Sequence, residues 1–125
     1  MKNRELIINN YIDGYNEFNI DKMVADLDDT IIFENIQGGE TNLVITGLED
    51  FKEQAEKAAT YFSERTQTIS SIQHSEKTTE IEINYNATLR IDLENGMKKG
   101  QQINLKGISI FEFQDGKIIR LTDKS

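Results

Sequence analysis

Alternation of apolar and polar residues dominates the second half of the chain and predicts a β-sheet. From Ile81 to Leu93 apolar side chains recur at every second position, and most of the positions between them carry charged or amide side chains. Such alternation is typical of a strand with one buried and one solvated face. Asp115-Gly116 predicts a hairpin between the last two strands, because glycine accepts a positive φ easily. The predicted strands cover residues 66–74, 79–93, 101–113 and 117–123.

The first half of the chain shows instead the three- and four-residue spacing of amphipathic helices. This spacing covers residues 5–18 and 48–62, and a short helix with Asn19 as its N-cap is predicted between them. A strand rich in β-branched residues is predicted at 30–36, and a loop around Gly38-Gly39 is expected to join it to the last helix. Helices followed by strands predict a single α+β domain over residues 1–125.

Composition and charge exclude several classes of function. The formal net charge of −8, without a stripe of Lys and Arg, disfavours nucleic acid and anionic membrane surfaces as partners. No stretch has the roughly 18 apolar residues of a membrane span, and no secretory signal begins the chain, so a cytoplasmic location is expected. With no cysteine and one histidine, disulfides and cysteine nucleophiles are excluded and no metal site is expected.

The order of elements and two local segments resemble the NTF2-like superfamily, which includes the SnoaL-like proteins. The segments are YNEFNIDKMVADLDDTIIFEN and GISIFEFQDGKIIRLTD, and the resemblance covers nearly the whole chain. It implies a cone in which a strongly curved, mostly antiparallel sheet wraps around three helices from the N-terminal half. It also implies a pocket for a small molecule at the wide end, and a homodimer that pairs through the sheet. Function does not follow from the fold alone.

Ketosteroid isomerases, one group in this superfamily, use a tyrosine and a protonated aspartate as an oxyanion hole and a second aspartate as the base. Tyr11 matches the tyrosine position, but Asn35 occupies the position of the base and Ser109 that of the acidic donor. Because an amide cannot carry a proton back and forth, the isomerase mechanism fails with these residues in those roles.

Limonene epoxide hydrolases resemble the chain more closely. That family activates water with an Asp-Arg-Asp constellation and holds the water with a Tyr-x-Asn pair. Arg90 and Asp92 match the Arg-x-Asp element, and Asp123, 31 residues further on, matches the second aspartate. Asn35 matches the asparagine that holds the water, while Phe33 replaces the tyrosine. The resemblance implies that Asp123 is the base, Asp92 the acid and Arg90 the bridge between them, with no cofactor.

Strand alternation tests these positions independently. Asp123 shares a face with Ile119 and Leu121, and Asn35 likewise continues an apolar face. Both polar side chains are therefore expected inside the cone, although an exposed carboxylate at a strand end is the alternative for Asp123. Buried polar groups of this kind need partners or water.

Two interpretations stay open for Arg90 and Asp92. Unbroken alternation places both side chains on the outer face of their strand. A β-bulge between Tyr85 and Leu89 would shift the phase by one residue and turn both side chains inward. The sequence favours the first interpretation, whereas the resemblance to epoxide hydrolases requires the second.

The expected ligand is a small, largely apolar molecule. Tyr11, Tyr15, Phe33, Ser109 and Leu121 are expected to line its pocket, with core packing as the alternative for the two tyrosines. Two functions remain: a cofactor-independent hydrolase or isomerase, most specifically one of epoxide-hydrolase-like type, and a non-catalytic module for ligand binding or dimerisation. They differ in whether the bound molecule is chemically converted.

Overall fold

The computed structural model describes residues 3–125, which form three helices and a six-stranded sheet. In chain order the elements are α1 (Arg4–Asn16), α2 (Ile20–Val24), β1 (Leu27–Gln37), β2 (Glu40–Thr46), α3 (Leu48–Ala59), β3 (Phe62–His74), β4 (Thr78–Leu89), β5 (Gln102–Gln114) and β6 (Lys117–Lys124). The strand order is β2-β1-β6-β5-β4-β3, and only the β1–β6 pair in it is parallel. This arrangement confirms the predicted α+β fold class. None of the helices described is long and apolar enough to cross a membrane.

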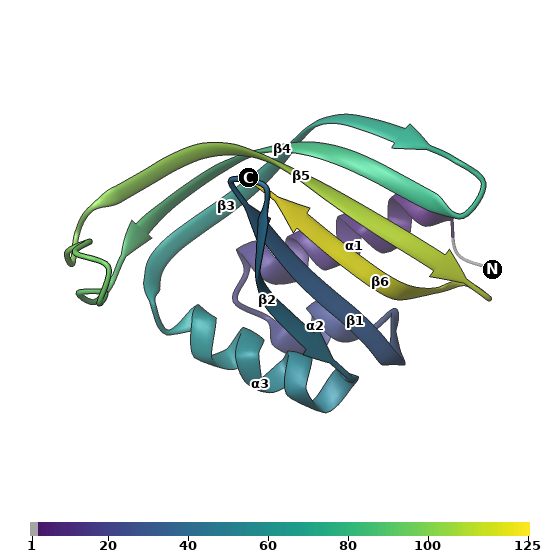
Figure 1. Cartoon of the computed structure of the whole chain (residues 1–125), viewed down its shortest axis with the longest axis horizontal. Helices are drawn as coiled ribbons and strands as arrows, with labels where there is room; N and C mark the ends of the chain where they lie inside the picture. The colour runs from purple at the N-terminus through teal and green to yellow at the C-terminus, as the bar shows by residue number, and fades with distance from the viewer. Residues whose placement is uncertain (1–2) are drawn as a thin grey trace.

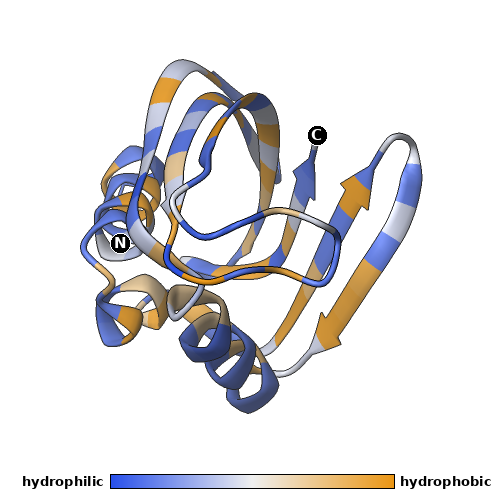
Figure 2. Ribbon diagram, turned by 90° about the vertical axis from the view of Figure 1, so that its left-hand side faces the viewer, coloured by the Kyte–Doolittle hydropathy of each residue, from blue (hydrophilic) through white to orange (hydrophobic). Residues whose placement is uncertain are grey.

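The sheet curls around the helices and gives the molecule the shape of a cone. β3, β4 and β5 are long and bend over the helices, whereas β1 and β2 form a shorter side (Figure 1). A view from one end shows the strands running around a central region, with the helices along one side (Figure 2). Register shifts in four strand pairs, β1–β2, β1–β6, β3–β4 and β5–β6, contribute to this shape, since a bulge bends its strand and increases the local twist.

The core lies between the helices and the concave face of the sheet. Phe111 and Leu121 are fully buried there, and the ring of Tyr11 packs edge-on against Phe111 with 5.7 Å between centroids. Burial of such side chains provides most of the favourable free energy of folding, at about 1.5–3 kcal/mol for each large apolar residue. The other core residues of the cluster are Ile7, Ile8, Ile12, Met23, Leu27, Ile31, Phe51, Ile81, Ile83 and Ile118.

A close contact between α1 and α2 fixes the C-terminal end of α1. A Cβ atom on Gly14 would lie 2.6 Å from the backbone nitrogen of Met23, so only glycine fits between the two helices. Asn19 caps α2 by accepting a hydrogen bond from the backbone N–H of Lys22 at 3.1 Å. The last turn of α1, which carries Tyr15, therefore has a fixed position beside the sheet.

The structure adds one strand that was not predicted and corrects two predicted boundaries. β2 forms where a loop was expected, because this edge strand is mostly exposed and depends on pairing with β1 rather than on a buried apolar face. β3 begins at Phe62, a residue that the helical spacing assigned to the last helix. β4 ends at Leu89 and not at residue 93; after Leu89 the chain enters a loop that leads to β5.

The face of β6 also differs in one position from the predicted one. Ile118 is buried with an exposed fraction of 1%, whereas Ile119 is only partly buried. The cause is a register shift between Glu112 and Phe113 in the β5–β6 pair, which changes the phase of alternation before Leu121. Beyond the shift, Leu121 remains on the inner face of the strand, as predicted.

Candidate functional site

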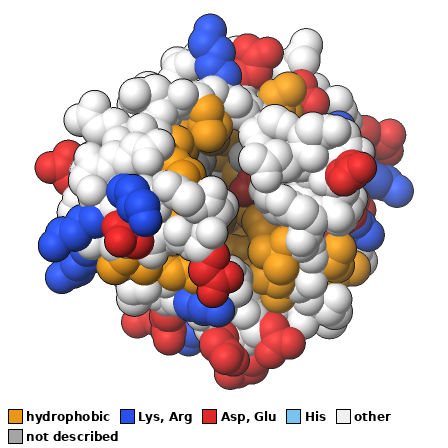
Figure 3. Space-filling view, turned by 60° about the vertical axis from the view of Figure 1, so that its left-hand side comes forward, with side chains coloured by type: hydrophobic (Ala, Val, Ile, Leu, Met, Phe, Trp, Pro, Cys, Tyr) orange, Lys and Arg blue, Asp and Glu red, His pale blue; other side chains and the backbone are white. Residues whose placement is uncertain are grey.

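A pocket of about 200 Å³ lies between the end of α1 and the sheet, beside the last residues of β6. Its lining combines tyrosines, amides and one carboxylate with apolar side chains. A space-filling view shows hydrophobic side chains gathered around a hollow between two more polar lobes (Figure 3). The lining residues are Tyr15, Asn35, Gln67, Ile83, Tyr85, Leu105, Gly107, Ile108, Ser109, Asp123, Lys124 and Ser125.

Asp123 supplies the carboxyl group of this pocket. It is partly buried near the end of β6 and pairs in register with Ser109 of β5. The Ser109 hydroxyl, which is buried, donates a hydrogen bond to Asp123 Oδ1 at 2.7 Å. Burial raises the pKa of Asp123 to about 6, while the hydrogen bond from Ser109 opposes the rise. Asp123 therefore changes its protonation state close to neutral pH.

Asn35 lies next to Asp123 across the parallel β1–β6 pair. Its Nδ2 donates a hydrogen bond to Oδ1 of Asn42 on β2 at 2.8 Å, which fixes the orientation of the Asn35 amide. As the alternation in β1 predicts, Asn35 is at the pocket, together with Asp123 and Ser109. Three of the residues selected from the sequence are thus brought together at one end of the sheet.

A pair of tyrosines, Tyr15 and Tyr85, forms another part of the lining. The Tyr15 hydroxyl donates to the Tyr85 hydroxyl at 2.7 Å. Burial raises the pKa of Tyr15, and the neighbouring Tyr85 adds to this rise. Burial also raises the pKa of Tyr85, whereas the hydrogen bond from Tyr15 and the charge of Arg65 act in the opposite direction. Both hydroxyls therefore keep their protons near neutral pH and can act as hydrogen-bond donors.

Three other residues expected to line the pocket belong to the core. Tyr11 is buried against Phe111, Leu121 is completely buried, and Phe33 packs edge-on against Phe51 of α3 with 5.7 Å between ring centroids. Burial raises the pKa of Tyr11, with a further contribution from the negative charge of Asp123. Tyr11 thus lies close enough to Asp123 for the carboxylate charge to affect its pKa. None of Tyr11, Phe33 and Leu121 is among the lining residues of the pocket.

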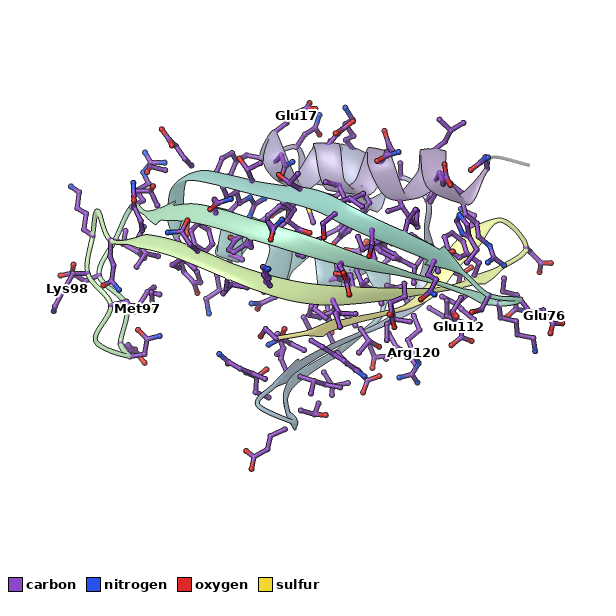
Figure 4. The ribbon with its side chains drawn as sticks, turned by 90° about the horizontal axis from the view of Figure 1, so that it is seen from above. Glu17, Glu76, Met97, Lys98, Glu112 and Arg120 are labelled. Carbon is purple, nitrogen blue, oxygen red and sulfur yellow. The ribbon has the colours of Figure 1, made fainter. Side chains whose placement is uncertain are left out.

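Arg90 and Asp92 lie away from the pocket. The pairing of β4 with β5 is unbroken from Thr78 to Thr88, so no bulge turns the following residues inward. Both residues are exposed in the loop after β4, where Asp92 Oδ1 accepts a hydrogen bond from the backbone N–H of Lys99 at 2.8 Å. Figure 4 places this loop, marked by Met97 and Lys98, at one extreme of the molecule, well beyond the end of β6.

The separation can be estimated along β4. Ile81 is the residue of β4 that pairs with Ser109, and Ser109 pairs in turn with Asp123. Since a strand rises about 3.3 Å per residue, Arg90 is about 30 Å further along the strand than Ile81. The structure therefore does not assemble the Asp-Arg-Asp constellation that the resemblance implies, and a catalytic role for Arg90 and Asp92 stays a prediction that this geometry does not favour.

Tyr85, Gln67 and Arg65 also belong to this region, although they were not among the residues expected to form the site. Alternation places Tyr85 on the apolar face of its strand, and nothing in that pattern marks its hydroxyl as functional. The side chain of Arg65, 4% exposed, lies over the ring of Tyr15 at 3.7 Å from its centroid. The available signal was alternation: Arg65 and Gln67 share a face with Ile69 once the strand is known to begin at Phe62.

A wider groove of about 620 Å³ adjoins the pocket and shares five lining residues with it, from Ile83 to Ser125. Its charged side chains, Glu82, Lys106 and Lys124, are exposed to solvent and have both signs. We place the candidate chemistry in the smaller pocket, because it holds the partly buried carboxyl of Asp123. Among residues 3–125 no group of three or more His, Asp or Glu side chains is arranged to hold a metal ion.

Comparison with known proteins supports the fold described above. The SnoaL-like domain family matches residues 8–121. A candidate polyketide cyclase from Xanthomonas campestris pv. campestris has a TM-score of 0.83 at 18% identity, covering 97% of this chain and 88% of that chain. An LEH-like epoxide hydrolase from M. tuberculosis has a TM-score of 0.75 at 15% identity, with 95% and 79% covered. AclR, a candidate hydroxylase from Streptomyces galilaeus, has a TM-score of 0.76 at 16% identity, with 96% and 86% covered.

At these identities the likenesses to solved structures show a shared fold. No curated protein matches the chain in sequence. The chemistry of the pocket therefore depends on the residues that form it.

Proposed function

The chain belongs to the SnoaL-like domain family, and we propose that it is a cofactor-independent enzyme that uses Asp123 to transfer a proton on a small, largely apolar carbonyl compound. The observation that carries this proposal is a partly buried carboxyl group in the pocket whose pKa is raised to about 6 by burial. A general base works best when its pKa lies near the operating pH. Perturbed carboxyl groups in a pocket are candidates for that role.

The surroundings of Asp123 suit a base that acts alone. Ser109 donates to Oδ1, which holds the carboxylate in one orientation and leaves Oδ2 as the oxygen that accepts a proton. No ion pair of Asp123 with a basic side chain is found within residues 3–125, so no salt bridge keeps the carboxylate in its charged form. The apolar lining, including Ile83 and Leu105, favours a substrate with little charge.

The separation of Arg90 and Asp92 from Asp123 supports proton transfer over epoxide opening. Opening an epoxide requires an acid at the ring oxygen together with a base for the water, and the residues matched to the acid and its bridge are exposed far from the pocket. Removal of a proton next to a carbonyl requires one base and hydrogen-bond donors for the oxygen. Asp123 would take the proton from carbon, the C–H electron pair would form the enolate, and the acid form of Asp123 would return the proton.

Exchange of protons for deuterium tests this proposal directly. Single-ring ketones such as cyclohexanone and acetophenone are incubated with the protein in D₂O, and loss of the signal from protons next to the carbonyl is followed by NMR. We expect exchange above the buffer rate that falls by about 100-fold or more in Asp123→Asn, since a positioned base contributes about 10²–10⁴-fold. Glu94→Gln, which removes an exposed carboxylate in the loop after β4, is the matched control.

A second candidate function is binding of a small molecule without conversion. It is favoured by the single carboxylate in a pocket of about 200 Å³, which is small compared with most ligand sites of about 300–1,000 Å³. This function predicts chemical-shift changes in pocket residues when a ligand is added, with no exchange and no product. Detection of a converted product by mass spectrometry that requires Asp123 would exclude it.

A further inference from the structure

The buried positive charge of Arg65 lies against the ring of Tyr15, one of the two tyrosines of the pocket. Arg65 is 4% exposed, and its guanidinium carbon lies 3.7 Å from the ring centroid of Tyr15 and 4.5 Å from that of Phe18. Its Nε donates a hydrogen bond to the backbone carbonyl oxygen of Tyr15 at 2.8 Å. No ion pair of Arg65 is found in the described part of the chain, residues 3–125. Burying an arginine without a carboxylate partner is costly. Because no carboxylate within that part of the chain neutralises it, the charge of Arg65 acts on the tyrosines.

The hydrogen bond between the two tyrosines has a direction. Each phenol has a single proton, and the Tyr15 proton is used in the bond to the Tyr85 oxygen. The Tyr85 proton is therefore left to point at a third acceptor. Because the Tyr85 oxygen already accepts a hydrogen bond, its own O–H is polarised and becomes a stronger donor. The positive charge of Arg65, stacked on Tyr15, acts on the pair in the same direction.

Tyr85 and Asp123 line the same pocket. We propose that the Tyr85 hydroxyl donates a hydrogen bond to an oxygen atom of the ligand, and that Tyr15 and Arg65 position and polarise this donor. This inference rests on the proposed function, and it names the substrate class. The substrate is a single-ring compound whose carbonyl or phenol oxygen carries partial or full negative charge, held at Tyr85 while the remainder of the molecule reaches Asp123.

The chemistry of the site supports an oxygen of this kind over other ligand groups. Hydroxyl donors backed by a cation stabilise a localised negative charge on oxygen, as the enolate of a ketone carries. Asp123 in the same pocket disfavours a ligand with a second negative charge near the carboxylate. A cationic ligand is disfavoured by Arg65. The volume of about 200 Å³ suits about one ring inside the pocket, and a larger ligand would extend into the adjoining groove.

A ligand that cannot react separates binding from catalysis. We choose 4-nitrophenol, because its phenolate is yellow and its neutral form is not, so absorbance reports the ionised fraction of the bound probe. A second probe, 4-nitrotoluene, has a similar shape and the same nitro group but lacks the phenol oxygen. Binding of both probes is measured for the full chain and for Tyr85→Phe. The control is Tyr61→Phe, which removes a hydroxyl near the start of β3, away from the pocket lining.

We expect Tyr85→Phe to weaken binding of 4-nitrophenolate by about 10- to 100-fold, which is the range for one hydrogen bond to a charged group. Binding of 4-nitrotoluene should stay the same, and Tyr61→Phe should leave both unchanged. Arg65→Met should lower the ionised fraction of the bound probe at a fixed pH, and Arg65→Lys should restore part of it. A role of Arg65 in packing alone would weaken binding of both probes without changing that fraction.

The inference is overturned if the unmodified protein does not bind 4-nitrophenol, if Tyr85→Phe binds it as tightly, or if Tyr85→Phe weakens both probes equally. These results are distinct from failure of the proposed function. If Tyr85→Phe keeps full affinity for 4-nitrophenol while Asp123→Asn abolishes deuterium exchange, Tyr85 does not bind the ligand oxygen, but Asp123 is the base. If Tyr85→Phe loses affinity but the protein catalyses no exchange, the oxygen site stands without the proton-transfer step.

Discussion

Replacing Asp123 by asparagine should stabilise the protein at alkaline pH and have little effect in acid. The pKa of Asp123 is raised from its ordinary value of 3.8 to about 6, because burial penalises the charged form. The native state therefore holds this proton at pH values where the unfolded chain has already released it. The stability that the proton contributes is fully present below about pH 4 and is lost as the pH rises through about 6.

The size of the effect follows from the difference of about two pH units. At about 1.4 kcal/mol for each unit, the upper bound is about 3 kcal/mol, and partial exposure of Asp123 reduces this to about 1–3 kcal/mol. Asparagine keeps an oxygen that can accept the hydrogen bond from Ser109, so the substitution removes the charge and preserves the contact. Few other substitutions isolate the buried charge as cleanly.

Urea denaturation followed by circular dichroism measures this effect. The free energy of unfolding is compared for the unmodified protein and Asp123→Asn at about pH 4 and about pH 8. We expect the variant to be more stable by about 1–3 kcal/mol at the higher pH, and the two proteins to be nearly equal at the lower pH. Glu94→Gln serves as the control for loss of an exposed negative charge. A variant that is less stable at about pH 8, or whose difference does not change with pH, would refute the reasoning.

Three further substitutions test other parts of the structure. Ser109→Ala should raise the pKa of Asp123 further, because the hydrogen bond from Ser109 keeps that pKa lower in the unmodified protein. The pH midpoint of deuterium exchange should therefore move upward. Gly14→Ala should destabilise the protein by about 1–3 kcal/mol in urea, since the new methyl group would meet the backbone of Met23. Arg4→Ala should cost about 1–3 kcal/mol, because Arg4 donates several hydrogen bonds to the turn between β3 and β4 and lies over an aromatic ring.

The two stability predictions share a control. Leu6 lies in α1 with an exposed fraction of 65%, so Leu6→Ala should change the free energy of unfolding by no more than about 0.5 kcal/mol. A loss in Gly14→Ala that did not exceed the loss in Leu6→Ala would contradict the close packing of α1 against α2. Unchanged stability in Arg4→Ala would show that its contacts with the turn contribute little in solution.

Much of the fold was predictable because its signals are local. Alternation along a strand and helical spacing depend on neighbours in sequence, and they predicted all three helices and five of the six strands observed in residues 3–125. β2 was missed because its residues are mostly exposed and its strand form depends on pairing with β1. Ile118 replaced Ile119 in the core because a bulge, which the sequence does not mark, changes the phase of β6.

The site was predictable where it follows from the phase of a strand or, for Tyr15, from the inner face of a helix. Asn35 and Asp123 continue apolar faces, and the structure places both at the pocket. The match of Arg90 and Asp92 rested on spacing in the sequence, and spacing does not determine distance in space. β4 ends at Leu89, and the residues after it form a loop far from β6. Arg65 was missed because its importance comes from stacking on Tyr15, a contact across 50 residues of sequence.

The most direct test of a base at Asp123 is the titration of its own carboxyl group. Protein labelled with ¹³C in aspartate is followed by NMR from about pH 3 to about pH 9, and the Asp123 signal is assigned by its absence from Asp123→Asn. We expect its midpoint at about 6, clearly above the ordinary aspartate value of 3.8. A midpoint near 3.8 would mean that Asp123 is solvated like a surface carboxylate, and the proposed proton transfer would lose its central support.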